Sequence, residues 1–167
     1  MLTTKRLRLR NLCDGDVNTI FDYRNDVRCN RYQRYTDTTR EYLEGFVKEY
    51  SNSRFLSLEP EQHYAIVLRE TSQMIGDLSV FFTPGDNCFT LGITIAPLYQ
   101  SNGYAYELLG NVTALLREKY PSADIVALID KDNLASISLF KKLKFTEECY
   151  AESIKSLVYV LQGETKK

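Results

Sequence analysis

Residues 100–105, with the sequence QSNGYA, are the stretch of this chain best suited to bind an anion. They follow an apolar, β-branched segment at 91–96, which predicts a buried strand that Pro97 ends. They precede apolar residues at helical spacing, and the first turn of a helix offers unpaired N–H groups and the positive end of its dipole. Gly103 permits positive φ or close backbone approach, so the loop can wrap around a phosphate. A purely structural turn is the alternative, because one glycine between a strand and a helix is common.

A second stretch, residues 125–145, has the same order of a strand, a polar turn and a short helix. Together the two stretches resemble the GNAT superfamily of acyl-CoA-dependent N-acetyltransferases. The family's first signature, Q/R-x-x-G-x-G/A, is matched by Gln100, Gly103 and Ala105. Its second signature has the form N-x-x-S, then an apolar pair, a lysine and a terminal phenylalanine. The residues that match it are Asn133, Ser136, Leu139, Lys142 and Phe145.

The opening of the chain, LTTKRLRLRNLCDGD, is similar to that of the GNAT branch that acetylates the N-termini of ribosomal proteins. The resemblance extends over essentially the whole chain and implies a single domain at residues 1–167. It also implies an α+β GNAT fold, in which helices flank a mixed, mostly antiparallel central sheet. In this fold the central strand parts from its neighbour around a bulge, and the pantetheine arm of acetyl-CoA enters the gap.

The resemblance also implies which residues bind acetyl-CoA. The backbone of Ile93 and Ile95 would pair with the pantetheine arm as an added strand pairs with a sheet edge. Asn133 would reach the arm, and Lys142 would approach the phosphates of the nucleotide. The pyrophosphate would sit on the backbone amides of Gln100, Ser101, Asn102, Gly103, Tyr104 and Ala105.

The implied reaction is the direct attack of a neutral amine on an acyl thioester in a ternary complex. The amide of Ile95 is the candidate that would stabilise the oxyanion. Many family members place a tyrosine acid where this chain has Phe140, and Ser136 matches the serine proposed for that role in the ribosomal-protein branch. Ser136 could equally be a helix N-terminal hydroxyl that satisfies backbone amides. Lys144 replaces the usual glycine before the last phenylalanine, so a turn with positive φ there would be strained.

Several groups could remove the proton from the amine. Asp77, on a predicted strand, is one candidate base, and a water chain held by Thr94 or by a tyrosine is another. Leu128 stands where some relatives carry a glutamate. His63, the single histidine, lies at a strand start and is better explained as structural. Positioning and desolvation of the amine could also suffice without a base.

The acceptor side is predicted from the irregular segment 24–36, which lines the active cleft in the resembled family. Tyr32, Gln33 and Tyr35 are therefore the candidate acceptor-binding residues, and a polar surface loop is the alternative. The expected acceptor is a primary amine, either a protein N-terminus or a small amino compound. A non-catalytic acyl-CoA-binding or regulatory domain is the second hypothesis for the whole chain.

Composition narrows the remaining choices. A hydrophobic fraction of 44%, a charged fraction of 26% and a net charge of −1 predict a globular protein without attraction to nucleic acid or membrane. The absence of an apolar run near 18 residues or of a signal peptide predicts a cytoplasmic location. Four scattered cysteines predict reduced, mostly buried thiols and no metal site. Acetyl-CoA and an amine are the expected partners, and a homodimer is expected from the family alone.

The order of the elements follows from hydrophobic periodicity and from turn residues. A strand at 5–11 precedes a helix that Asp14 would cap, and a second helix would be capped by Asp37 or Thr38. Strands at 63–70, 74–82 and 91–96 form an antiparallel meander, and the long helix follows the 100–105 loop. The chain then has a strand at 125–129, a helix at 134–143 and strands at 145–150 and 157–162.

Overall fold

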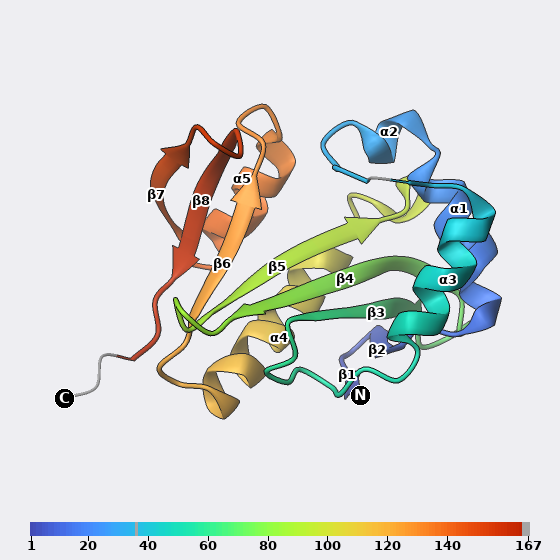
Figure 1. The fold of residues 1–167 in the computed structure, drawn as a ribbon, viewed down its shortest axis with the longest axis horizontal. Coiled ribbons are helices and arrows are strands. Elements are labelled where there is room, and N and C mark those ends of the chain that lie inside the picture. Colours follow the sequence, from blue (N-terminus) through green and yellow to red (C-terminus); the bar gives the residue numbers. More distant parts are fainter. Residues whose placement is uncertain (36, 165–167) are drawn as a thin grey trace.

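The computed structural model describes residues 1–35 and 37–164, which build one eight-stranded sheet with helices on both faces (Figure 1). The strands are β1 (Leu2–Thr3), β2 (Leu7–Asn11), β3 (Glu61–Leu68), β4 (Met74–Thr83), β5 (Cys88–Ile95), β6 (Asp124–Ile129), β7 (Thr146–Ala151) and β8 (Ser156–Leu161). The α-helices are α1 (Val17–Arg24), α2 (Val27–Asn30), α3 (Arg40–Tyr50), α4 (Tyr104–Lys119) and α5 (Leu134–Lys142). Short 3-10 helices, η1 and η2, span Asp14–Asp16 and Pro97–Tyr99.

The sheet is mixed and mostly antiparallel, as the sequence predicts. Its strand order is β1-β2-β3-β4-β5-β6-β8-β7, and every neighbouring pair is antiparallel except β5 with β6. The predicted antiparallel meander of β3, β4 and β5 is confirmed. A parallel pair needs a long crossover, which α4 provides between β5 and β6.

The strands β5 and β6 share only a short paired region. Residues 88–90 of β5 pair with residues 124–126 of β6, and the two strands then diverge so that a gap opens beyond Thr90 (Figure 1). Pairing of β5 with β4 continues without a break to Ile95. The expected bulge in β5 is not found, because the register shifts fall between β3 and β4, opposite Ile66 and Val67, and between β7 and β8, at Glu147 and Cys149. The gap therefore comes from the divergence of β5 and β6 and not from a bulge in β5.

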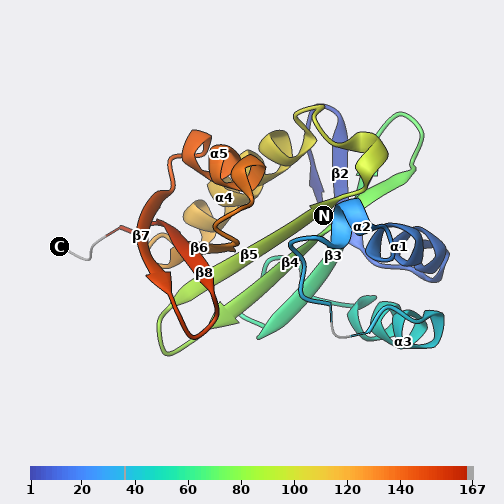
Figure 2. The same cartoon turned by 90° about the horizontal axis from the view of Figure 1, so that it is seen from above.

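Two hydrophobic clusters cover the two faces of the sheet. Figure 2 shows α4 and α5 on one face and α3 on the other. Successive residues of β3 alternate between the clusters: Tyr64 and Ile66 pack on the α4 side, whereas Ala65 and Val67 pack with α1 and α3. This alternation is the period of a strand that is buried on both faces. The same alternation decides which side chains of β5 lie on each face of the sheet.

Several boundaries differ from the predicted ones because other residues occupy the N-cap positions. Asp14 does not cap α1: it begins η1, and the Asp16 carboxylate accepts a hydrogen bond from the Cys13 N–H at 2.8 Å. Thr39 caps α3, while Asp37 accepts from the Thr39 N–H at 2.7 Å. The segment 24–36, predicted to be irregular, contains the short helix α2. The two-residue strand β1 was also not predicted.

Candidate active site

A cleft of about 880 Å³ lies where β5 and β6 diverge. Its walls come from the end of β5, the start of α4, the helix α5 and the segment around α2. The residues that line it are Arg28, Cys29, Tyr32, Gln33, Ile93, Thr94, Ile95, Tyr99, Gln100, Ser101, Gly103, Tyr104, Ala105, Tyr106, Asn133, Ala135, Ser136, Ser138, Leu139, Lys142 and Lys144. Of the residues predicted to bind the cofactor, the described lining leaves out only Asn102, whose side-chain amide donates to the carbonyls of Tyr99 and Gln100.

The end of β5 presents backbone groups to this cleft. The Ala96 N–H donates to the Ile75 carbonyl at 2.8 Å, on the β4 side. Because backbone groups alternate along a strand, the N–H groups of Ile95 and Ile93 point the other way, toward the gap. The Ile95 carbonyl accepts a hydrogen bond from the Gln100 side-chain amide at 2.8 Å. The strand edge therefore has the arrangement needed to pair with an extended ligand.

The loop at 100–105 has the geometry of an anion site. Ser101 and Gly103 adopt left-handed conformations, with φ of 61° and 76°. The first hydrogen bond of α4 runs from the Glu107 N–H to the Gly103 carbonyl at 3.0 Å. The amides of the residues between them, Tyr104, Ala105 and Tyr106, precede this bond and have no intrahelical acceptor. The N-terminal end of the helix dipole adds a partial positive charge at the same place.

The helix α5 forms the opposite wall of the cleft. Asn133 caps it through Oδ1, which accepts from the Ser136 N–H at 3.2 Å, so its amide nitrogen is left to donate to a ligand. Ser136 and Lys142 both line the cleft. Phe140 is buried and its ring packs against Phe145 at 5.0 Å, so the position of the family's tyrosine acid belongs to the core here.

A second cavity, of about 220 Å³, lies against the α3 face of the sheet. Its described lining shares Gln33 and Thr94 with the main cleft, so the two cavities meet at the end of β5. The three predicted acceptor residues gather here. Tyr32 lines the main cleft, Gln33 lines both cavities and Tyr35 lines the second. The Tyr35 hydroxyl is 3.1 Å from Thr94 Oγ1, at the junction.

Asp77 lines the second cavity, but its carboxylate is already engaged. It accepts hydrogen bonds from the Tyr23 hydroxyl at 2.6 Å and from Arg24 Nη2 at 3.1 Å, and all three side chains are buried. The Arg24 guanidinium stands 4.5 Å from the centres of the Tyr35 and Phe46 rings. The carboxylate thus holds a buried cation in place.

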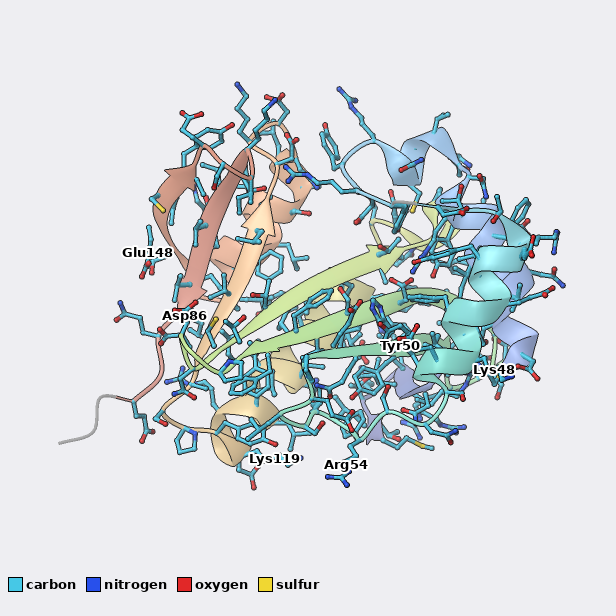
Figure 3. The ribbon with its side chains drawn as sticks, viewed as in Figure 1. Lys48, Tyr50, Arg54, Asp86, Lys119 and Glu148 are labelled. Carbon is cyan, nitrogen blue, oxygen red and sulfur yellow. The ribbon has the colours of Figure 1, made fainter. Side chains whose placement is uncertain are left out.

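His63 also lines the second cavity, among aromatic side chains. Its ring centre is 4.5 Å from that of Tyr50, which Figure 3 marks where α3 meets the sheet, and 4.7 Å from that of Phe46. Its Nε2 lies 2.7 Å from a Glu61 oxygen. Burial lowers the pKa of His63, although the hydrogen bond to Glu61 opposes this effect. The imidazole is therefore neutral near pH 7, and its contacts are those of a packed core residue.

Cys29 is the one thiol in the described lining of the cleft. Its Sγ lies 3.9 Å from the Ile95 carbonyl, to which it donates. Burial and the nearby charge of Asp77 raise the pKa of Cys29 to about 11. A thiol rather than a thiolate is present at neutral pH, and a thiol is a poor nucleophile.

The described residues hold four free cysteines, and they are less buried than predicted. Cys29 is buried, Cys88 is half-buried, and Cys13 and Cys149 are exposed. Within residues 1–35 and 37–164, no group of three or more His, Cys, Asp or Glu side chains is placed to hold a metal ion. In the same part of the chain, every helix is too short or too polar to cross a membrane.

Comparison with known sequences identifies the family. Residues 6–146 match the sequence model of the acetyltransferase (GNAT) domain. The chain belongs to the GNAT acetyltransferase family. This GNAT protein is 23% identical over 147 residues to the uncharacterized N-acetyltransferase YnaD of Bacillus subtilis (strain 168), a match that covers 88% of this chain and 83% of that protein.

Solved structures show the same fold. A candidate ribosomal-protein-serine acetyltransferase from Vibrio cholerae superposes with a TM-score of 0.79 at 19% identity, over 96% of this chain and 95% of that one. Spermidine N-acetyltransferase from Vibrio cholerae, in complex with CoA and spermine, superposes with a TM-score of 0.73 at 18% identity, over 92% of each chain. The predicted GNAT fold and acetyltransferase class are confirmed, and acetyl-CoA is the acyl donor of this family. The non-catalytic alternative is not favoured.

Proposed function

We propose that this GNAT protein transfers an acetyl group from acetyl-CoA to a primary amine by direct attack within a ternary complex. The observation that carries the proposal is the meeting of two cavities at Gln33 and Thr94. The larger cavity has a strand edge and an anion-binding loop for the donor. The smaller one gives an amine a separate approach to the same point. Both substrates can therefore be bound together, with the reacting atoms near Thr94.

In this proposal the donor occupies the main cleft. The pantetheine arm pairs with the N–H groups of Ile93 and Ile95, and the pyrophosphate lies on the amides at the start of α4. Asn133 donates to the arm from the other wall, and Lys142 faces the phosphates. Thermal unfolding tests this binding mode. Acetyl-CoA at about 100 times its dissociation constant should add roughly 2.7 kcal/mol to the free energy of unfolding, whereas ATP and NAD at the same concentration should add much less.

The chemical step follows from the groups at the junction. The amine attacks the thioester carbon, the Ile95 N–H donates a hydrogen bond to the developing oxyanion, and the carbon–sulfur bond breaks. Ser136 Oγ then donates a hydrogen bond to the departing thiolate. Because a thiol has a pKa of ~8.5, the thiolate is already a fair leaving group, and this hydrogen bond contributes little to the rate.

The proton leaves the amine through the second cavity into solvent. Asp77 is one proton acceptor there, and water held by Thr94 and Tyr35 is the other. We assign the main role to water, since the Asp77 carboxylate already accepts from Tyr23 and Arg24. Asp77 then acts by holding Arg24 beneath the ring of Tyr35. Replacement of Asp77 by Asn should therefore lower the free energy of unfolding by more than it raises the activation free energy that sets kcat.

The direct path is favoured over an acetyl-cysteine intermediate. Cys29 is the thiol placed to form one, and its raised pKa keeps it protonated at neutral pH. Initial-rate kinetics distinguish the two routes. With both substrates varied, a ternary complex gives intersecting double-reciprocal lines. Parallel lines would instead support a covalent intermediate.

For the acceptor, a protein N-terminus and a small amino compound are the two candidates. The second cavity, at about 220 Å³, is smaller than typical ligand pockets of about 300–1,000 Å³, which favours a narrow, unbranched amine. The spermidine N-acetyltransferase and the candidate ribosomal-protein-serine acetyltransferase among its structural neighbours represent these two classes. Release of free CoA should be measured with spermidine and with a peptide that begins with serine. If neither substrate is acetylated, and no other amine in a panel is acetylated either, the proposed activity is refuted.

A further inference from the structure

Arg6 connects the N-terminal segment to the anion-binding loop, although 96 residues separate it from Asn102. Arg6 lies between β1 and β2. Its Nη1 donates to the Asn102 carbonyl at 2.9 Å, and its Nε donates to Glu107 Oε2 at 2.6 Å. Its backbone N–H donates to Glu107 Oε1 at 2.7 Å. One residue thus binds both the loop and the first turn of α4.

Glu107 receives a further hydrogen bond from Thr4 Oγ1, at 2.6 Å. Burial alone would raise the pKa of Glu107, but the hydrogen bonds from Thr4 and Arg6 outweigh it and lower the pKa. The side chain of Glu107 is only 15% exposed, against 42% for Arg6. A carboxylate in the first turn of a helix is also favoured by the helix dipole. The pair is therefore a partly buried, charge-assisted contact between two distant segments.

The guanidinium of Arg6 lies under the loop. Its Cζ stands 4.5 Å from the centre of the Tyr104 ring, and its Nη2 would be 3.6 Å from a Cβ atom at Gly103. Gly103 and Tyr104 both line the cleft, whereas the described lining leaves out Arg6. Arg6 therefore supports the loop from the side away from the cleft.

The bond to Asn102 has a defined effect on the loop. A peptide group is planar and trans, so its C=O and the following N–H point in opposite directions. The Asn102 carbonyl points toward Arg6, which turns the Gly103 N–H away from Arg6 and toward the cleft. Gly103 can hold the left-handed conformation this requires, at φ of 76°. Arg6 thus orients a backbone donor without touching the ligand.

We propose that Arg6, held by Glu107, is a positioning residue for the pyrophosphate loop, and this proposal rests on the proposed binding of acetyl-CoA in the cleft. Fixing the loop in its binding geometry before the cofactor arrives removes an entropic cost from binding. Loss of the side chain should therefore weaken the binding of CoA about ten- to hundredfold, the range of one charge-assisted hydrogen bond.

The sign of the Glu107 effect separates positioning from simple electrostatics. Replacing Glu107 with Gln removes a negative charge close to the phosphate site, so electrostatics alone would tighten CoA binding. If Glu107 acts by holding Arg6 and the loop, the same change weakens binding. The variant keeps the shape of the side chain and its place in the first turn of α4.

Arg10 supplies a matched control on the same N-terminal segment. It forms a two-point ion pair with Asp16, with Nη1–Oδ2 at 2.7 Å and Nη2–Oδ1 at 2.8 Å. The described lining of both cavities leaves out Arg10. Arg10→Met should cost stability without changing CoA affinity, so it reports what loss of an arginine ion pair does to the fold alone.

The experiment measures the dissociation constant of CoA by calorimetry at 25 °C for wild type, Arg6→Met, Arg6→Lys, Glu107→Gln and Arg10→Met, with the melting temperature of each. Arg6→Met and Glu107→Gln should bind at least tenfold more weakly than wild type, Arg6→Lys should lie between, and Arg10→Met should stay within about threefold. An Arg6→Met affinity within threefold of wild type, or tighter binding by Glu107→Gln, would overturn the proposal.

A truncated donor provides the second measurement. S-acetylpantetheine lacks the pyrophosphate, so Arg6→Met should leave its kcat/KM unchanged while raising the KM for acetyl-CoA. An equal loss with both donors would mean that Arg6 acts through the fold and not through the loop. Wild-type protein that fails to bind CoA would refute the proposed function itself, together with this inference. Wild-type binding with unchanged variants would refute the inference alone.

Discussion

Lys144 occupies a backbone position that favours glycine, and this gives a quantitative prediction. It follows α5 with φ of 69°. The Phe145 N–H donates to the Phe140 carbonyl and the Lys144 N–H donates to the Lys141 carbonyl, both at 3.0 Å. This pair of bonds is the Schellman motif, which places its left-handed residue at Lys144. The sequence predicts strain at this position, and the structure shows the conformation that produces it.

Replacing Lys144 with Gly should therefore relieve this strain and leave the free energy of unfolding nearly unchanged. A left-handed conformation costs a non-glycine residue about 1–2 kcal/mol, and glycine loses about 0.5–1 kcal/mol through its freer unfolded state. Loss of a cation at the helix C-terminus costs about 0.3–1 kcal/mol more. At the midpoint of each range these contributions nearly cancel and leave a change of about 0.1 kcal/mol, so the melting temperature of Lys144→Gly should stay within about 1 °C of that of wild type. Urea unfolding followed by circular dichroism measures it.

Lys141→Gly is the matched control, because Lys141 lies in the last turn of α5. It removes the same charge, but it places glycine where the backbone is helical. This variant should lose about 1 kcal/mol or more of unfolding free energy. The free energies of unfolding of the two glycine variants should thus differ by about 1–2 kcal/mol, the cost of the left-handed conformation. If Lys144→Gly lost as much stability as Lys141→Gly, the strain argument would be wrong.

Three further predictions concern the site. Cys29→Ala should keep kcat within about threefold of wild type in steady-state assays, since the protonated thiol does no covalent work. Ser136→Ala should lower kcat by about tenfold or less, because a thiolate is already a fair leaving group. His63→Phe should leave kcat nearly unchanged and should flatten the pH dependence of stability. In wild type, the pKa lowered by burial makes the folded state bind fewer protons than the unfolded state, so stability is full above pH ~6.5 and falls as the pH drops below it.

A specific result would contradict each of these three predictions. Inactivity of Cys29→Ala, with its melting temperature preserved, would indicate an acetyl-enzyme. A loss of a hundredfold or more in Ser136→Ala would make Ser136 a true general acid. A similar loss in His63→Phe, measured together with loss of the acid limb of the pH–rate profile, would make His63 the base. Unfolding curves of the His63 variant between pH 5 and 8 separate the stability effect from the catalytic one.

The parts of the fold that are predictable from the sequence have local signals. The apolar run at 91–96 ends at Pro97, which cannot donate to a ladder, and Gly103 adopts the left-handed conformation that precedes α4. These signals placed β5, the loop and α4 within a few residues. The caps of α1 and α3 were less predictable, because several Asp and Thr residues in a row compete to accept from the same amides.

Contacts between distant segments had no local signal. Asp77 is a plausible base when seen as a carboxylate on a strand, but the sequence does not show that Tyr23 and Arg24 of α1 reach it. The pairing of Arg6 with Glu107 crosses 101 residues, and each side chain alone is typical of a solvated charge. The packing of α1 and α4 against the sheet creates both contacts.

In the proposed function, the alternation of side chains along β5 lets one strand serve two substrates. Ile93 and Ile95 pack on the α4 side, and their backbone faces the gap toward β6. Thr94 and Gly92 point to the opposite face, where they line the second cavity. A strand has a period of two, so in this proposal the residues that face the donor and those that face the acceptor alternate along β5. The sequence GITI fits this alternation: Gly92 and Thr94 leave space on one face, and Ile93 and Ile95 pack on the other.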